Sequence, residues 1–262
     1  MNIIADEDFK NCLSWEEKAQ KNPLYAVMSS EKFANIGPEK WSPEDLKTFF
    51  LKGQYMFDVF FKPVIVRAKF EKERAFIVEY GSGMGRILKA VNAAGYRCAG
   101  IDISPTMLAH SQRLVPEVND LYCLDDQGNC GIETHSADFV YSYAVIQHIK
   151  ELRLVQQALS EMCRIMKPDG YLKFQYRTIT NQIPFKRIKT AGEKLFNFET
   201  KSLLVKSANF ESLEHNNWFG VPLSFDFIER VLNNARVEVI GIEQDVGKKG
   251  NMIWLLGKKL QA

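Results

Sequence analysis

Three glycines and one aspartate have the types and the spacing of a nucleoside-binding site. Gly81, Gly83 and Gly85 follow an apolar run in the stretch VEYGSGMGRI. A turn without β-carbons lets a ligand come close to the backbone. Asp102 stands 21 residues after Gly81 at the end of the next apolar run, where a carboxylate accepts hydrogen bonds from ribose hydroxyls. Together these residues predict that the chain binds a nucleoside.

The residue after the glycine turn argues against a dinucleotide cofactor. The dinucleotide pattern G-x-G-x-x-G needs a glycine or alanine at its last position, because the helix there packs closely on the strand. That position is Arg86. We therefore expect a nucleoside whose tail is not a pyrophosphate, and an NAD-dependent oxidoreductase is the alternative.

Composition narrows the class of protein further. The 262 residues carry 34 Lys and Arg against 32 Asp and Glu, a formal charge of +2, which gives no general attraction to nucleic acid. The stretch MNIIADEDFK is acidic where a secretory signal is basic, and no apolar run reaches the length of a membrane span. We expect a cytoplasmic protein without a membrane partner.

The five cysteines include no C-x-x-C pair. Cys123, Cys130 and His135 could be imagined as metal ligands. Scattered reduced thiols are the interpretation that we favour, so no metal is expected.

The elements around the glycine turn alternate between strand and helix. Strands are predicted at residues 75–80, 96–102, 137–143 and 171–177, and helices at 86–95, 104–115 and 151–166. This alternation predicts an α/β fold with a parallel sheet that binds its ligand at the carboxyl ends of the strands. The last two strands, 236–243 and 251–259, are predicted to form an antiparallel pair.

Two segments fall outside this alternation. Residues 1–73 have apolar positions at helical intervals and predict an N-terminal helical cap segment, with Ser42 as an N-cap and interruptions near Gly53 and Pro63. Residues 178–222 form an insertion before the helix 224–235. Long segments above this edge of a sheet usually cover a site, so we expect a substrate lid.

Four motifs over residues 75–177 resemble those of class I S-adenosylmethionine-dependent methyltransferases. They are EYGSGMGR, GIDIS, SADFVYSYAVIQHI and RIMKPDGYLKFQ, in the family's order. The resemblance assigns residues 74–262 to the methyltransferase domain. It implies a Rossmann-like, seven-stranded, mostly parallel sheet of order 3-2-1-4-5-7-6 with one antiparallel strand.

The resemblance also implies a site for S-adenosylmethionine, with its methionine part over Gly81 and Gly83, its ribose on Asp102 and its adenine near Met107. The implied cofactor residues are Glu79, Gly81, Gly83, Arg86, Asp102, Ile103, Ser104, Met107, Leu124, Asp125, Ser142 and Tyr143. After the third strand, Asp126 is an alternative to Leu124 and Asp125. Structural roles also remain open: Gly85 as the start of a helix, Arg86 along its surface, and Met107 in the core.

The acceptor side is less clearly marked. His148, just after the fourth strand, is the candidate base, with packing or helix capping as the alternative. Tyr143 and Gln147 are expected to line the pocket. Gln175 and Arg177 would face the acceptor, or Tyr176 if the strand register shifts by one.

The insertion supplies the remaining acceptor candidates. His215, Asn217 and Trp218 suit a sugar or another polar ring, although Trp218 equally suits anchoring the lid. Lysines and arginines outnumber acids between residues 178 and 211, which favours an anionic acceptor or a solvated surface.

We therefore expect an enzyme that transfers a methyl group from S-adenosylmethionine to a small polar acceptor. An oxygen of a sugar, a glycan precursor, including a phosphorylated one, or a secondary metabolite is expected to receive it. Methylation of a peptide or RNA is one alternative, and the near-neutral charge weakens the RNA case. A non-catalytic nucleoside-binding module is another, against which the intact Gly81, Gly83 and Asp102 count.

Overall fold

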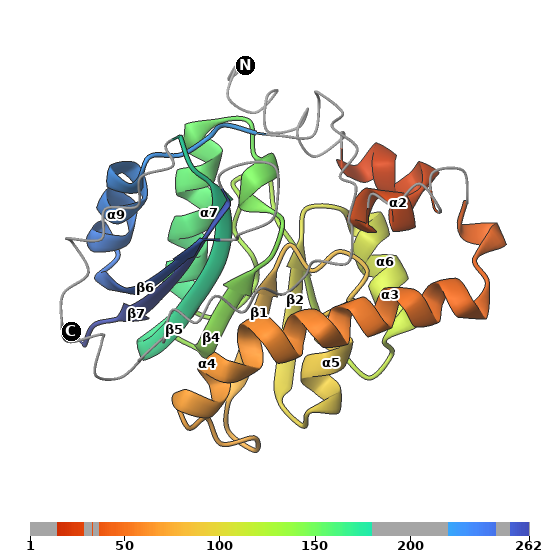
Figure 1. The fold of residues 1–262 in the computed structure, drawn as a ribbon, viewed down its shortest axis with the longest axis horizontal. Coiled ribbons are helices and arrows are strands. Elements are labelled where there is room, and N and C mark those ends of the chain that lie inside the picture. The colour runs from red at the N-terminus through yellow and green to blue at the C-terminus, as the bar shows by residue number, and fades with distance from the viewer. Residues whose placement is uncertain (1–14, 29–32, 34–36, 180–219, 245–251, 262) are drawn as a thin grey trace. The chain divides into compact units, whose positions relative to one another are not determined.

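A computed structural model describes residues 15–28, 33, 37–179, 220–244 and 252–261 (Figure 1). The chain divides after Ile132 into two compact units. Seven strands form one sheet of order β3-β2-β1-β4-β5-β7-β6, which confirms the predicted α/β class and strand order. Within the described ranges, no helix is long and apolar enough to cross a membrane.

The first unit contains three parallel strands, β1 (Phe76–Tyr80), β2 (Arg97–Asp102) and β3 (Asp120–Cys123). Two helices, α5 (Leu88–Ala93) and α6 (Pro105–Leu114), pack against β2. Gly95 ends the first of them with a φ of 88°, which a glycine adopts without strain. The strands β1 and β2 therefore deliver the glycine turn and Asp102 to the same edge of the sheet.

Helices precede β1, as predicted. They are a helix over residues 15–21, α2 (Pro23–Met28), η2 (Pro38–Lys40), α3 (Pro43–Met56), the π-helical turn η3 (Phe57–Phe61) and α4 (Lys62–Arg67). Ser42 caps α3 as predicted, and its side chain and that of Asp45 form a capping box.

The expected interruption at Gly53 is wrong. Helix α3 continues through Gly53 to Met56, and the irregular turn η3 follows it. A β-carbon at Gly53 would lie 2.0 Å from the carbonyl oxygen of Arg86. This glycine therefore allows a close backbone contact and does not break the helix.

The second unit contains β4 (Ala137–Ser142), η4 (Ile146–His148), α7 (Leu152–Ile165), β5 (Met166–Arg177), α9 (Phe225–Asn234), β6 (Val237–Gln244) and β7 (Met252–Lys259). The strand β7 runs antiparallel to both β5 and β6, as predicted for the terminal pair.

The stretch KPDG lies inside β5 and does not precede it. Met166 pairs with Ala137 and Tyr171 pairs with Phe139, so the residues between them bulge out of the ladder. Asp169 in this bulge has a φ of 62°. The strand therefore begins directly after α7, earlier than its alternating pattern indicated.

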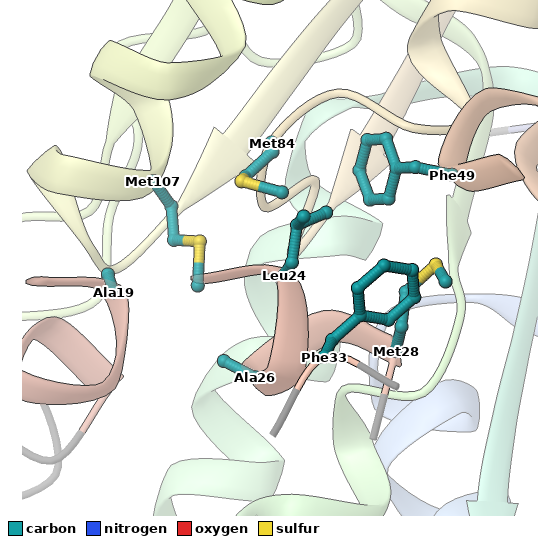
Figure 2. Packing of buried hydrophobic residues seen from close by; sticks show 8 residues of the cluster. All are labelled: Ala19, Leu24, Ala26, Met28, Phe33, Phe49, Met84 and Met107. Atoms are coloured by element: carbon teal, nitrogen blue, oxygen red, sulfur yellow. The ribbon is translucent and has the colours of Figure 1, made fainter. Parts of the chain in front are cut away.

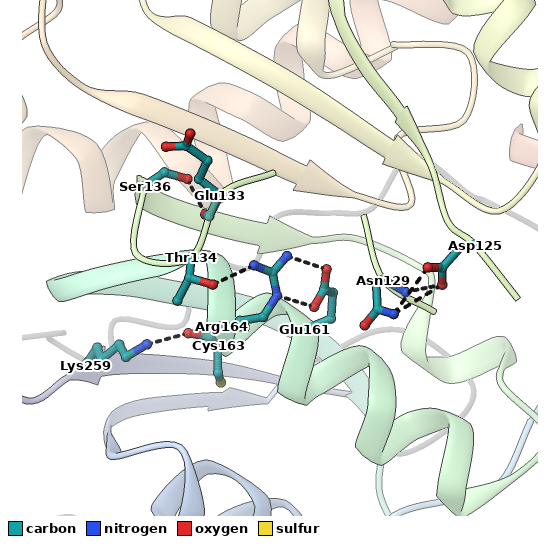
Figure 3. Close-up of polar contacts among 9 residues, drawn as sticks. All are labelled: Asp125, Asn129, Glu133, Thr134, Ser136, Glu161, Cys163, Arg164 and Lys259. Carbon is teal, nitrogen blue, oxygen red and sulfur yellow. Dashed lines mark hydrogen bonds and ion pairs between the residues drawn. The ribbon is translucent and has the colours of Figure 1, made fainter. Parts of the chain in front are cut away.

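Polar contacts at its C-terminal end hold α7 in the second unit (Figure 3). The ammonium group of Lys259 donates hydrogen bonds to the carbonyl oxygens of Cys163 (2.6 Å) and Met166 (3.0 Å), where the helix ends. Arg164 donates two hydrogen bonds to Glu161, at 2.7 and 2.8 Å, and one to Thr134. A cation at a helix C-terminus satisfies carbonyl groups that have no partner within the helix.

Candidate active site

The glycine turn uses the left-handed backbone region at all three glycines. The φ angles of Gly81, Gly83 and Gly85 are 77°, 53° and 76°, which residues with a β-carbon rarely adopt. The N–H groups of Gly81 and Ser82 donate to the carbonyl oxygen of Ile101, at 2.7 and 2.9 Å. These bonds fix the turn to the end of β2.

The half-buried carboxylate of Asp102 connects the turn to the start of α6. Its Oδ2 accepts from the N–H of Gly83 at 2.7 Å, and its Oδ1 accepts from the N–H of Ser104 at 2.9 Å. Burial raises the pKa of Asp102, and hydrogen bonds from Ser104, Gly83 and Ile103 act in the opposite direction. A carboxylate has about four acceptor positions, so capacity remains for a ribose hydroxyl.

Ser104 and Met107 lie in the first turn of α6. The hydroxyl of Ser104 accepts from the N–H of Met107 at 3.1 Å, so Ser104 is the N-cap of α6. The Met107 side chain is buried in a cluster with Ala19, Leu24 and Met84 (Figure 2). Ile103 links Asp102 to this turn, and the Cys123 thiol lies 3.8 Å from its carbonyl oxygen.

Two further cofactor candidates flank the glycine turn. Glu79 is buried on β1, in register with Gly100. The guanidinium group of Arg86 lies 5.8 Å from the centre of the Phe49 ring, a cation–π distance. Arg86 precedes α5 and does not lie along its surface, so the contact gives it a packing role in the turn, and its contact with the cofactor stays a prediction.

The residues after β3 divide into two groups. The N–H of Leu124 donates to the carbonyl oxygen of Asp102 at 3.0 Å, which places Leu124 at the same edge of the sheet. Asp125 and Asp126 are exposed. The carboxylate of Asp125 accepts from the N–H groups of Asn129 (2.8 Å) and Gln127 (2.9 Å), and these bonds lower its pKa (Figure 3). Asp125 therefore forms a local turn, and its contact with adenine stays a prediction.

The acceptor candidates of the second unit begin at the end of β4. Ser142 is buried. The ring of Tyr143 stacks on that of Trp254, with centres 5.5 Å apart and planes inclined by 7°. Ala144 has a φ of 57°, a left-handed conformation that costs free energy for a residue with a β-carbon. The loop is thus held in one unusual conformation directly after Tyr143.

Gln147 and His148 lie side by side in η4. The amide nitrogen of Gln147 is 3.2 Å from Nε2 of His148. Which of the two side chains donates in this contact depends on the tautomer of the imidazole. To act as a general base, Nε2 would have to leave this contact and be unprotonated.

The chain that follows the insertion is tied to η4 and β5. The N–H of Gly220 donates to the carbonyl oxygen of Gln147 at 2.8 Å, and Arg177 donates to the carbonyl oxygen of Gly220 at 2.6 Å. A β-carbon at Gly220 would lie 1.9 Å from the carbonyl oxygen of Ile149. Arg177 therefore anchors this segment, and Gln175 is fully buried on β5. Their contact with an acceptor stays a prediction.

Part of the predicted site falls outside the described residues. His215, Asn217, Trp218 and residues 180–219 of the expected lid belong to this part. Among the described side chains, no group of three or more His, Cys, Asp or Glu could hold a metal ion. Cys123 is exposed, and Cys130 is buried.

Sequence reasoning missed Glu16, which bonds to the start of α6, and Trp254, which stacks on Tyr143. The alternating pattern of residues 251–259 placed Trp254 on a strand. No local pattern indicated the partner of either residue.

Comparison with known proteins identifies a methyltransferase domain in the chain. Residues 78–174 match the family model described as a methyltransferase domain. The chain therefore contains a methyltransferase domain over these residues. The matched residues run from β1 through most of β5 and include the glycine turn, Asp102 and η4.

Solved structures share the fold of this methyltransferase. Magnesium protoporphyrin IX methyltransferase from Synechocystis PCC 6803, with bound S-adenosylhomocysteine, has a TM-score of 0.56 at 14% identity, covering 90% of this chain and 93% of that chain. A methyltransferase from Methanosarcina mazei has a TM-score of 0.54 at 15% identity, covering 76% and 98%. One from Clostridium acetobutylicum has a TM-score of 0.53 at 11% identity, covering 90% and 97%. No curated protein matches the chain in sequence.

The methyltransferase's own residues fit its cofactor, S-adenosylmethionine. The turn has the left-handed backbone that three glycines allow, and the Asp102 carboxylate keeps acceptor capacity at the end of β2. When bound, the cofactor supplies an electrophilic methyl group. The chain must hold it, orient an acceptor and exclude water.

Proposed function

We propose that this methyltransferase methylates an oxygen of a small polar acceptor, such as a sugar, a glycan precursor, including a phosphorylated one, or a secondary metabolite. The observation that carries the proposal is the side chain of Gln147. Its Oε1 is buried and has no hydrogen-bond partner among the described residues. A buried carbonyl oxygen without a donor is unfavourable, and a hydroxyl group of the acceptor would supply one.

The neighbours of Gln147 support the same reading. A hydroxyl of the acceptor that donates to Gln147 Oε1 would place a second, neighbouring hydroxyl beside His148. Once Nε2 has left its contact with Gln147, His148 would take up the proton that this second hydroxyl loses when its oxygen is methylated. The partly exposed ring of Tyr143, held against Trp254, offers a face for the C–H groups of a polar ring.

In the first unit, we propose that Asp102 binds the ribose hydroxyls of the cofactor. The adenine then lies at the start of α6. The hydrogen bonds of Asp102 to Gly83 and Ser104 support this assignment, because they hold its carboxylate at the junction of the two segments. The glycine turn then receives the methionine part of the cofactor.

A screen of hydroxylated acceptors tests the proposal. Formation of S-adenosylhomocysteine should depend on a sugar or another small hydroxylated compound. Gln147→Ala should raise the KM for that acceptor, and His148→Ala should lower turnover by about 100-fold or more with little change in cofactor affinity.

Gln156→Ala, an exposed substitution on α7, is the matched control and should behave as wild type. Activity confined to peptides or RNA would contradict the proposed acceptor class. Wild-type turnover of His148→Ala across a pH series would reject His148 as the base.

A further inference from the structure

The carboxylate of Glu16 joins the N-terminal helix 15–21 to the first turn of α6. Its Oε2 accepts from the hydroxyl of Ser104 at 2.6 Å and from the N–H of Thr106 at 3.2 Å. Its Oε1 accepts from the hydroxyl of Thr106 and from the amide of Gln20. An acidic side chain is stabilised at a helix N-terminus, where backbone N–H groups have no partner within the helix.

Hydrogen bonding outweighs burial in setting the ionisation of Glu16. Burial acts to raise its pKa, but the bonds from Ser104 and Thr106 bring the pKa below the ordinary value of 4.5. The carboxylate therefore stays charged at neutral pH, in the state that accepts all of these bonds.

The same N-terminal segment packs on the glycine turn. Leu24 and Ala19 are buried in one cluster with Met84 of the turn and Met107 of α6 (Figure 2). A β-carbon added to Gly83 would lie 3.2 Å from Val27. Residues 15–28 thus contact both segments that Asp102 connects.

Ser104 is the point where these contacts meet. Its N–H donates to Asp102, its hydroxyl donates to Glu16, and the same oxygen accepts from the N–H of Met107. Because a hydroxyl has one proton, donation to Glu16 fixes which way the Ser104 lone pairs point. Glu16 therefore orders the residues around the proposed ribose and adenine positions.

We propose that Glu16 is a positioning residue for the cofactor. Its hydrogen bonds hold the N-terminal helices over the ribose and adenine of the cofactor, so that release of the cofactor requires these bonds to break. The inference rests on the cofactor site proposed above. It predicts that Glu16 controls how fast the cofactor product leaves.

The dissociation rate of S-adenosylhomocysteine from the full chain tests this inference. Glu16→Gln removes the charge but keeps the size of the side chain, so release should be at least about 10-fold faster, the scale of losing one hydrogen bond to a charged group. Glu17→Gln changes the same charge at an exposed position of the same helix and should release at the wild-type rate. Equal rates for the two variants would overturn the proposal.

A second readout separates positioning from a general loss of structure. In the wild type, S-adenosylhomocysteine should slow amide hydrogen exchange in residues 15–28, and in Glu16→Gln this protection should disappear while β1 and β2 stay protected. Thr106→Val should accelerate release of S-adenosylhomocysteine from the wild-type chain. It should have a smaller effect in the Glu16→Gln background, because the contact between Thr106 and Glu16 is already lost there. Full additivity would count against the contact as the cause.

The Asp102→Ala variant distinguishes failure of this inference from failure of the proposed site. Unchanged affinity in that variant would reject the cofactor assignment itself. Weakened binding in Asp102→Ala, with wild-type release in Glu16→Gln, would reject only the role of Glu16.

Discussion

Asp102 combines a structural and a binding role in one carboxylate. It already accepts backbone hydrogen bonds from Gly83 and Ser104, and its remaining acceptor capacity is assigned to the ribose. Because a hydrogen bond to a charged group contributes about 1.5–3 kcal/mol, Asp102→Ala should weaken S-adenosylhomocysteine binding by about 10- to 100-fold. Calorimetric titration of the two proteins measures the difference.

The raised pKa of Asp102 adds a pH dependence. Protonation removes acceptor capacity, so wild-type affinity should fall as pH decreases, starting at a higher pH than the ordinary value of 3.8 would give. Asp120, at the start of β3, has a carboxylate that accepts a hydrogen bond from Arg97. The variant Asp120→Ala is therefore the control and should keep full affinity for S-adenosylhomocysteine. Loss of binding in both variants would point to a folding defect.

The spacing of Gly81, Gly83 and Asp102 was sufficient to predict the residues of the glycine turn and the strand end. The left-handed φ angles explain why, since only glycine adopts them freely. Glu16 could not be found this way, because its bond to Ser104 spans 88 residues and depends on tertiary packing. The stacking of Tyr143 on Trp254 is hidden for the same reason.

Local signals also explain which element boundaries could be predicted. Ser42 caps its helix as predicted, because its bond reaches only three residues along the chain, and Ser104 and Ser224 cap theirs by bonds of the same span. The interruption expected near Gly53 and the strand start expected at residue 171 are both wrong. In both places, a contact with a distant segment determines the backbone conformation. Arg86 is the partner of α3, and β4 is the partner of β5.

Helix α3 gives a prediction at this scale. In an isolated helix, Gly53→Ala would be stabilising by up to about 1 kcal/mol. Here the added carbon would lie 2.0 Å from the Arg86 carbonyl oxygen, a backbone atom that cannot turn away. We therefore expect Gly53→Ala to lower the free energy of unfolding by about 1–3 kcal/mol, as for overpacked cores.

Denaturant titration of wild type and variant measures this change. Leu51→Ala, at a 60% exposed position two residues earlier in α3, should stay within about 0.5 kcal/mol of wild type. A stabilised Gly53→Ala protein would show that α3 does not pack on Arg86. The direction of the effect thus tests the contact as well as the residue.

At the scale of the whole molecule, stability should depend on a buried charge in β5. Lys173 is 3% exposed, with its ammonium group 3.5 Å from Glu243 and 5.5 Å from the centre of the Trp254 ring. Burial lowers the pKa of Lys173 below its ordinary 10.5, and Glu243 compensates only in part. Folding at neutral pH therefore carries an unfavourable contribution from this charge.

The sign of the pH dependence follows from proton binding. Between the lowered pKa and 10.5, the unfolded chain binds more protons at this site than the folded chain, so Lys173 makes stability rise with pH there. Removing one partner of an ion pair is strongly destabilising when the other charge stays fully buried, but the Glu243 side chain is 33% exposed and stays hydrated after the change. Lys173→Met should therefore be as stable as wild type or more stable at pH 7, with any advantage shrinking as the pH approaches 10.5.

Comparing the two proteins at each pH isolates Lys173, because other groups titrate in both. Burial raises the pKa of Cys98 and of Cys163 to about 12, so both thiols make stability fall above their ordinary value of 9. That fall is common to wild type and variant. If the variant were less stable than wild type at pH 7, the ion pair with Glu243 would stabilise the folded chain by more than burial of the ammonium group destabilises it. Lys173 would then contribute to stability.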